Sequence, residues 1–371
     1  MSSAAAVRPI TRADIPKVIE LLYSEFRYSE ATVTRLFENP DLRMGTAGEL
    51  PTGFVLEEDG QIIGYHDAFP REIYYKQTPY KALYRGSLYI EKSHRDHAHL
   101  PMLFFTELKQ DWCDLFVVNS ANEQGGRANK AFRFKPGPES CAGVRLRIFS
   151  YSRTLLYGTS KSKRLSRVPR PIRTAGCYML GGFWRLANFF GSGRLPKEKT
   201  NLTPRRIDAI TDGVFQPFWD ELLKTNRGVL TSRRPDVLRW TFNYGLETGR
   251  KVILGRFDGE KLRGYIVLRM VTTRDGFPRV RVNDWIAADN DEAVLGDLLR
   301  DAVGFVRKEK KGILLQMTGF PESVQPLIRQ YLPAYRAKPN AFYYKAKNRE
   351  LAEHLADSWF FGPYDGDSAR I

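Results

Sequence analysis

The order of apolar runs and turn signals repeats along this 371-residue chain. In each half a short strand precedes helices, a hairpin, a further strand and then alternating helix and strand. Each hairpin is marked by an acidic turn that contains Gly between apolar runs, at 57–60 and 258–261. Such turns favour tight strand connections. The repeated order restricts the chain to two similar α/β (α+β) units, although the halves share no close sequence identity.

The element pattern follows from hydrophobic periodicity, caps and turn residues. In the first half we expect strands at 7–11, 53–56, 61–69, 71–76, 82–90, 115–118 and within 143–156, and helices at 14–26, 29–37, 100–111 and after Asn122. In the second half we expect strands at 205–210, 251–257, 262–270, 279–287, 312–317 and 341–346, and helices at 214–223, 235–242, 291–308 and 321–331.

Charge is concentrated in one segment. The chain carries a net charge of +16, and residues 159–200 hold ten Lys or Arg against one acid, Glu198. Within this segment an uncharged stretch at 174–184, followed by Arg185, fits an amphipathic helix. It either crosses between the domains, lies on an anionic membrane face or docks an acidic acyl-carrier protein. Nucleic acid is not expected, because no module for it is visible.

Cysteine usage and the N-terminal sequence indicate the compartment. The three cysteines lie far apart, without metal-ligand spacing, which favours reduced thiols and no metal. The first residues lack a signal-peptide pattern, and no window has the apolar length of a membrane span. We therefore expect a cytoplasmic protein, with peripheral membrane contact through 159–200 as an alternative.

The stretch from 115 to 134 combines a β-branched and aromatic strand with a capped helix. The strand Leu115–Val118 runs into an Asn-Ser-Ala-Asn cap, and the helix closes on Phe132 and Phe134. Strand-to-helix turns of this kind are places where α/β sheets open ligand crevices.

This stretch resembles the strand-5/helix-4 segment of the GNAT (GCN5-related N-acetyltransferase) superfamily. Asn122 matches the Asn that opens the helix, and Phe134 matches the Phe of a closing Gly-Phe pair, whose Gly is replaced by Arg133. Asn129 stands where many members carry a Tyr that protonates the leaving thiolate. The resemblance implies two tandem GNAT-like domains, each a mixed, mostly antiparallel sheet flanked by helices.

The domain boundaries follow from the repeated order and the basic segment. We expect an N-terminal GNAT-like domain at 1–158, a basic linker with an amphipathic helix at 159–200, a C-terminal GNAT-like domain at 201–348 and a docking tail at 349–371. Aromatic residues mixed with acids in the tail indicate a docked segment, and its ending resembles those of tandem-GNAT proteins from bacterial polysaccharide and envelope gene clusters.

The resemblance also places a coenzyme A site. The family's pyrophosphate loop, Arg/Gln-x-x-Gly-x-Gly/Ala, corresponds to Arg95–Leu100 at a helix start, where amides and the helix dipole favour phosphates. Its glycine positions are Ala98 and Leu100 here. The corresponding place in the second half, 288–293, has three acids and no Arg or Gly, so we expect that domain not to bind coenzyme A. The residues expected at the cofactor are Ile90, Arg95, His97, Ala98, His99, Leu100, Asn122 and Asn129.

Catalysis in this family needs a base that takes a proton from the acceptor amine. Glu91, directly after the strand 82–90, is the first candidate, and His66–Asp67 and the loop residues His94, His97 and His99 are alternatives. Two further acids are candidates for holding an acceptor. Asp284 interrupts an apolar strand, where an unpaired charge is costly, and Asp365 lies in the tail.

The sequence therefore predicts an N-acyltransferase that moves an acetyl or other acyl group from acyl-coenzyme A to an amine of an amino sugar or other polar metabolite. Two alternatives remain open. One is a transferase of the same fold that takes its acyl group from acyl-carrier protein or aminoacyl-tRNA, and the other is a non-catalytic scaffold of degenerate domains.

Overall fold

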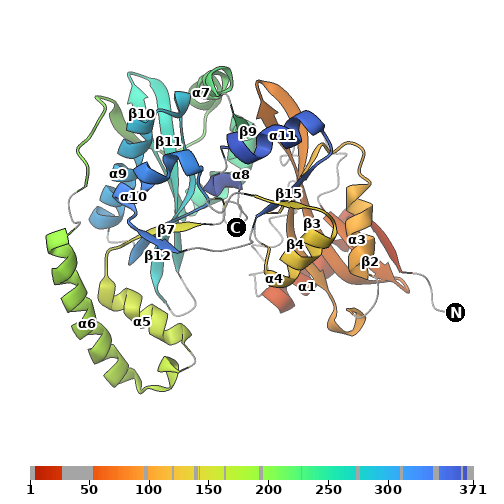
Figure 1. The fold of residues 1–371 in the computed structure, drawn as a ribbon, viewed down its shortest axis with the longest axis horizontal. Helices are drawn as coiled ribbons and strands as arrows, with labels where there is room; N and C mark the ends of the chain where they lie inside the picture. Colours follow the sequence, from red (N-terminus) through yellow and green to blue (C-terminus); the bar gives the residue numbers. More distant parts are fainter. Residues whose placement is uncertain are drawn as a thin grey trace.

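The computed structural model contains two sheets, each with helices on both faces (Figure 1). It describes residues 5–26, 53–95, 99–118, 121–137, 141, 143–162, 164–191, 195–226, 228–272, 276–309, 312–336, 342–360 and 362–365. The expected fold class, mixed sheets of mostly antiparallel strands flanked by helices, is confirmed. The helix expected at 29–37 and the loop residues His97 and Ala98 lie outside the described residues.

The first sheet is built mainly from the first half of the chain. Across the described residues its order is β1 (Ala6–Pro9), β2 (Gly53–Glu58), β3 (Gln61–Tyr75), β4 (Thr78–Ile90), β5 (Leu115–Val118), β15 (Tyr343–Ala346) and β6 (Lys135–Pro136). β4 and β5 are parallel, and the other neighbours along this path are antiparallel. A short strand, β9 (Val229–Thr231), extends this sheet by pairing with the end of β3.

The second sheet has the same order of strands. Across the described residues it runs β8 (Thr203–Ile207), β10 (Lys251–Asp258), β11 (Lys261–Thr272), β12 (Pro278–Ala287), β13 (Leu314–Thr318), β7 (Val144–Ile148) and β14 (Ala334–Arg336). Its one parallel pair along this path, β12 with β13, corresponds to β4 with β5. The two sheets therefore share one order of strands and have their parallel pair at the same place.

Each sheet has a strand from the other half of the chain inserted near one end of its path, in addition to β9, which pairs with β3. β15 lies between β5 and β6, and β7 lies between β13 and β14 (Figure 1, where β15 is blue and β7 is yellow). The ranges 1–158 and 201–348 stay a prediction as domains, but the sheets do not follow them. Because local pattern identifies a strand but not its partner, the sequence assigned β7 and β15 to their own halves.

One strand is longer than expected. The segments predicted at 61–69 and 71–76 form the single strand β3, which continues through Pro70. β2 pairs with β3 only as far as Asp67, and β9 begins at Ile73. Pro70 therefore lies where β3 has β4 alone as a neighbour, which is the kind of edge position that tolerates a residue without an N–H.

Helices cover both faces of each sheet, and two further helices lie apart from the sheets. They are α1 (Ile15–Phe26), α3 (His99–Leu108), α4 (Glu123–Ala131), α5 (Tyr151–Lys161), α6 (Arg170–Gly191), α7 (Asp212–Thr225), α8 (Pro235–Glu247), α9 (Glu292–Glu309), α10 (Gln325–Tyr331) and α11 (Arg349–Ser358). α3 and the segment after α4 pack over one face of the first sheet, and α1 and α11 pack over the other. In the second sheet α9 and α10 face α7 and α8 across the strands.

The described residues at the end of the chain pack between the sheets. Trp359 packs with the core of the first sheet, and Phe360 and Tyr364 pack with α7, α8 and the second sheet. Tyr364 and Asp365 are buried. The tail therefore contributes to the contact between the two sheets.

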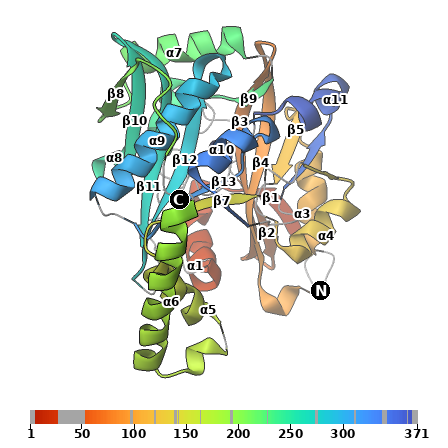
Figure 2. The same ribbon diagram turned by 60° about the vertical axis from the view of Figure 1, so that its left-hand side comes forward.

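The basic segment forms a helical hairpin. α5 and α6 pack against each other and project away from both sheets (Figure 2). Of the helices in the described part of the chain, none combines the length and apolar character needed to span a bilayer.

The cysteines are buried thiols. Cys113, Cys141 and Cys177 are free, as expected from their spacing. Burial raises the pKa of the Cys113 thiol to about 12, so this group stays protonated at neutral pH and is a poor nucleophile.

Candidate functional site

In the described part of the first sheet, the pairing of β4 with β5 ends at Arg85 and Val118, which leaves an opening between the two strands. β5 pairs with β4 only from Ala82 to Arg85, whereas β4 continues to Ile90 alongside β3. Among the described residues no strand pairs with the β5-facing edge of β4 after Arg85. At about 3.3 Å per residue, the stretch from Gly86 to Ile90 offers roughly 15 Å of strand edge. An extended ligand with amide groups can pair along such an edge like an added strand.

The helix α3 begins beside the outer end of this opening. Ile90 ends β4, and His99 and Leu100 form the first turn of α3. Arg95 turns back toward the strand, where its Nε donates to the carbonyl oxygen of Ile90 at 2.8 Å. The structure thus brings together four of the residues predicted at the cofactor, around a helix N-terminus whose amides favour anions.

Histidine and glutamate side chains brace the turn before α3. His99 is buried, and its Nδ1 lies 2.8 Å from the carbonyl oxygen of His94. Glu58 on β2 approaches both rings, with its carboxylate 3.3 Å from Nε2 of His94 and 4.0 Å from Nε2 of His99. Glu91 is half-buried, with its carboxylate 4.0 Å from Nδ1 of His94. His99 therefore joins the start of α3 to His94.

These histidines and acids do not form a metal site. Across the described residues no group of three or more His, Cys, Asp or Glu side chains has a metal-binding arrangement.

A bulge in β3 places Asp67 at the inner end of the opening. The β3–β4 register shifts between His66 and Ala68, so Asp67 lies opposite no single β4 residue. Its carboxylate lies against Gly86, where an added Cβ would be 2.5 Å from Oδ2 of Asp67. The hydroxyl of Tyr65 donates to Oδ1 of Asp67 at 3.0 Å. Gly86 is the first β4 residue beyond the pairing with β5, and its lack of a side chain makes room for the carboxylate.

On the opposite face of the same strands is a buried polar cluster. Glu107 of α3 lies 2.9 Å from Nε of Arg85 and 3.2 Å from Nδ1 of His66. Nη1 of Arg85 donates to Oδ1 of Asn129 at 2.8 Å, and its guanidinium lies 3.9 Å from the centre of the Phe104 ring. All four polar residues are buried.

The charges in this cluster are set by burial and by neighbours. Burial lowers the pKa of His66 more than Glu107 raises it, so His66 is neutral near neutral pH. Burial raises the pKa of Glu107, but Arg85 and His66 outweigh it and the net shift is downward. The cluster is therefore an ion pair of Arg85 and Glu107 with a neutral imidazole at its end.

The two predicted asparagines of α4 have different roles. Asn122 caps the helix, since its Oδ1 accepts from the backbone N–H of Gly125 at 2.8 Å. Asn129 points inward, where it accepts from Arg85 and donates to the carbonyl oxygen of Gly125 at 2.8 Å. Asn129 thus connects α4 to Arg85 of β4.

Arg133, which replaces the Gly of the family pair, has φ of +59°. A side chain is disfavoured in this left-handed conformation by about 1–2 kcal/mol. Arg133 is exposed, and its replacement by Gly loses little packing. After allowing for the greater backbone entropy of Gly in the unfolded chain, we expect Arg133→Gly to stabilise the protein by about 0.5 kcal/mol. Urea unfolding of both proteins tests this, and a less stable variant would contradict it.

Asp284 and Asp365, the two other predicted acids, lie in one buried cluster between the sheets. Asp284 forms an ion pair with Arg233, with Nη2 of Arg233 at 3.0 Å and Nε at 3.1 Å from its oxygens. The hydroxyl of Tyr265 donates to Oδ2 of Asp284 at 2.7 Å, and the backbone N–H of Trp285 donates to Oδ1 at 2.9 Å. Both oxygens of Asp284 therefore accept hydrogen bonds. This arrangement is typical of a structural ion pair rather than of a catalytic base.

Asp365 connects the tail to the first sheet. It accepts hydrogen bonds from Thr231 of β9, from the Tyr84 hydroxyl at 3.3 Å and from the backbone N–H of Gly362 at 2.8 Å. Burial raises the pKa of Asp365, and Arg233 and these donors only partly offset that rise. Arg71 lies over the rings of Tyr84 and Tyr364, with its terminal nitrogens buried and without a hydrogen-bond partner.

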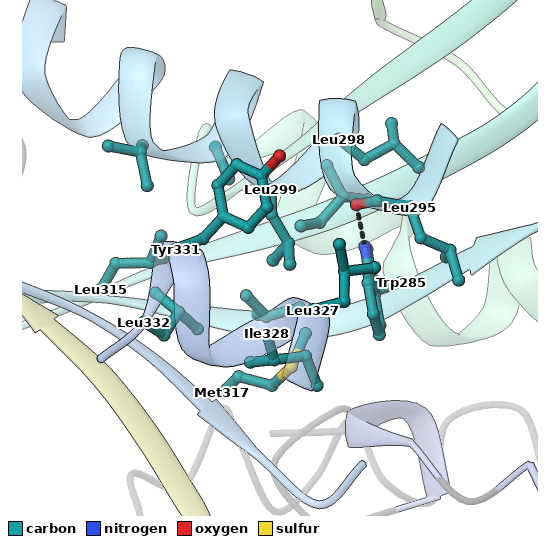
Figure 3. Packing of buried hydrophobic residues seen from close by; sticks show 14 of the residues in the cluster. Trp285, Leu295, Leu298, Leu299, Leu315, Met317, Leu327, Ile328, Tyr331 and Leu332 are labelled. Carbon is teal, nitrogen blue, oxygen red and sulfur yellow. Dashed lines mark hydrogen bonds between the residues drawn. The ribbon is translucent and has the colours of Figure 1, made fainter. Parts of the chain in front are cut away.

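The corresponding region of the second sheet has no free helix start. Asp291 caps α9, since its Oδ1 accepts from the backbone N–H groups of Ala293 at 2.8 Å and Val294 at 3.2 Å. The pairing of β12 with β13 ends at Val282. Trp285 follows on β12, where it packs against α9 and donates to the carbonyl oxygen of Leu295 at 3.0 Å (Figure 3). The first backbone donors of α9 are therefore occupied by Asp291, and the absence of coenzyme A binding by this half stays a prediction.

Comparison with solved structures establishes the fold of this chain. Searches with the sequence found no matching family model and no matching curated protein. A GCN5-related N-acetyltransferase from Anabaena variabilis is similar in structure, with a TM-score of 0.56, 12% identity, and coverage of 93% of this chain and 73% of that one. A protein from Pyrococcus horikoshii gives a TM-score of 0.53 at 13% identity over 97% and 94% of the two chains. Eis1 from Mycobacterium abscessus gives 0.52 at 12% identity over 94% and 75%.

These likenesses extend over nearly the whole chain. At such low identity they establish the fold, which is that of the GCN5-related N-acetyltransferases. The resemblance inferred from residues 115–134 is therefore confirmed at the level of the fold.

Proposed function

We propose that the protein is an N-acyltransferase that moves an acetyl or other acyl group from acyl-coenzyme A to an amine of an amino sugar or other polar metabolite. The observation that carries the proposal is the opening between β4 and β5, which ends beside the N-terminus of α3. The GNAT fold of the structural neighbours supports the same class of reaction.

The two ends of the opening between β4 and β5 determine the orientation of the acyl-coenzyme A donor. Its pyrophosphate lies at the start of α3, held by Arg95 and by the backbone amides of the first turn of that helix. Its pantetheine arm pairs along β4 from Ile90 back toward Gly86, and this brings the thioester to the inner end of the opening. The acceptor amine attacks the thioester carbonyl carbon, and the bond to sulfur breaks.

Asp67 is the acid that best fits the role of base. It lies against Gly86, where the reacting carbon arrives, whereas Glu91 lies at the outer end of the strand beside the turn. A base must be within hydrogen-bond reach of the proton that it removes. We assign proton transfer from the amine to Asp67 and keep Glu91 as the alternative from the sequence.

Binding of the donor is tested by thermal unfolding with and without acetyl-coenzyme A. A ligand that binds only the native state stabilises it by about 2.7 kcal/mol at 100 times its dissociation constant. We expect Tm to rise for the wild-type protein and to stay unchanged for Arg95→Glu. Arg250→Glu is the matched control, because it makes the same charge change at an exposed arginine of the second half.

The result also separates the alternatives. Absence of a shift with any acyl-coenzyme A would contradict the proposal and favour the non-catalytic scaffold. An equal shift in Arg95→Glu would place the donor elsewhere. For the acceptor, mass spectrometry of amino sugars and other polar amines incubated with protein and acetyl-coenzyme A identifies the acetylated product.

A further inference from the structure

The helical hairpin of α5 and α6 has an outward face that the fold does not use. α6 approaches α5 through Cys177 and Gly181, both buried. The contact is close, because a Cβ on Gly181 would lie 2.5 Å from the backbone nitrogen of Ser152. Residues at i, i+7 and i+11 share one side of a helix. Ile172, Met179 and Phe183 have this spacing and lie on the side away from α5.

That outward face is apolar. Among the described residues nine large apolar side chains are exposed, and seven of them belong to this hairpin. The exposed fraction reaches 74% for Met179 and 69% for Phe183. Six of the seven are on α6, namely Ile172, Tyr178, Met179, Leu180, Phe183 and Trp184. Exposed apolar groups gathered on one element mark an interaction surface rather than ordinary scatter.

The same hairpin is strongly cationic. Residues 151–191 contain eight Lys or Arg and no Asp or Glu, which is half of the net charge of +16. Six of the eight lie at the turn between the helices and the start of α6, from 161 to 173. Arg164, Arg167 and Arg170 are exposed. The apolar face therefore begins beside a cluster of cations at the far end of the projection (Figure 2).

The apolar face and the cationic turn together indicate what binds to the outward face of the hairpin. A second copy of the chain would bring two such cationic hairpins together, and like charges would oppose the contact. A membrane with anionic lipids satisfies both features, because aromatic and aliphatic side chains enter the headgroup region while Lys and Arg meet the lipid charges. The projection of the hairpin beyond the sheets leaves it accessible to a flat surface.

We propose that the α5–α6 hairpin is a membrane-surface anchor that binds anionic phospholipid through its cationic turn and the apolar face of α6. The anchor is independent of acyl transfer. It holds the protein on the bilayer surface without a spanning segment.

Co-sedimentation with vesicles tests the anchor with the full chain. We expect binding to vesicles that contain one third phosphatidylglycerol and weak or no binding to phosphatidylcholine alone. Each Lys or Arg near an anionic surface strengthens binding by roughly fivefold. The triple variant Arg164→Glu, Arg167→Glu, Arg170→Glu should therefore lower the partition coefficient by about 100-fold or more.

Two further variants complete the design. Lys224→Glu, Arg250→Glu, Lys308→Glu makes the same net charge change at exposed residues outside the hairpin, and we expect it to retain most of the binding. Ile172→Ser, Met179→Ser, Phe183→Ser keeps the charge and removes the apolar face, and we expect a loss of about tenfold or more. Because these side chains are exposed, the variants should unfold at the wild-type Tm.

Three results would overturn the anchor. The first is equal binding to both kinds of vesicle, or no binding to the anionic ones. The second is a dimer in light scattering that the serine variant dissociates, which would make a second copy the occupant. The third is absence of vesicle binding together with salt-sensitive binding of an acidic acyl-carrier protein that both hairpin variants abolish.

Discussion

Replacing Asp284 by alanine is expected to lower the free energy of unfolding by about 3–5 kcal/mol, because it leaves Arg233 buried without its counterion. Both side chains are fully buried, and Arg233 donates to the carboxylate through two of its nitrogens, Nε and Nη2. Tyr265 would lose its acceptor as well. The loss should be visible in urea unfolding as a lower midpoint.

Two comparisons show that the loss comes from the unpaired charge. In the double variant Arg233→Met with Asp284→Leu no buried charge is left unpaired, so we expect it to be more stable than Asp284→Ala. Asp208→Ala breaks the exposed pair with Arg206, and we expect a change within about 1 kcal/mol. If Asp284→Ala unfolds like the wild type but no longer transfers the acyl group, Asp284 is a catalytic group, and its interpretation as a structural ion-pair partner is wrong.

The order of the elements could be predicted from the sequence, because turns and caps depend on residues that are close together in the chain. Acidic turns with Gly marked both hairpins, and β2–β3 and β10–β11 are joined at those positions. Asn122 caps α4 as its side chain and position predict. Signals of this kind depend on residues a few positions apart, and sequence pattern resolves them well.

The partners of distant segments could not be read in the same way. The exchange of β7 and β15 between the sheets depends on contacts between residues about 170 or more positions apart in sequence. The pairing of Arg233 with Asp284 joins residues 51 positions apart. Asp284 could be singled out from the sequence, because a charge in an apolar strand needs a partner, but the pattern did not indicate which residue that partner is.

Part of the candidate site could be predicted from the sequence. The residues around the start of α3 follow from the local motif at Arg95–Leu100. Arg85 and Glu107 were missed, although Arg85 interrupts the apolar run of β4 and thus carries the same signal as Asp284. Gly86 was missed because its importance depends on the bulge at Asp67, which is a property of strand pairing rather than of composition.

Replacing Asp67 by asparagine is expected to lower kcat by about 10²–10⁴-fold, the usual contribution of a positioned base. The amide keeps the size of the side chain and can still accept from Tyr65, so the fold and the binding of acetyl-coenzyme A should be retained. Steady-state kinetics with the acceptor found by mass spectrometry measures kcat, and thermal unfolding with acetyl-coenzyme A measures donor binding.

Glu91→Gln and Gly86→Ala decide between the two acids. If Asp67 is the base, Glu91→Gln should change kcat by less than about tenfold. Gly86→Ala should impair catalysis too, because its methyl group occupies the place of the Asp67 carboxylate, 2.5 Å from Oδ2. The reverse pattern, with a large loss in Glu91→Gln and little change in Asp67→Asn, would move the reacting carbon to the outer end of β4. The donor would then be oriented along the strand opposite to the direction proposed, with its thioester rather than its pyrophosphate beside α3.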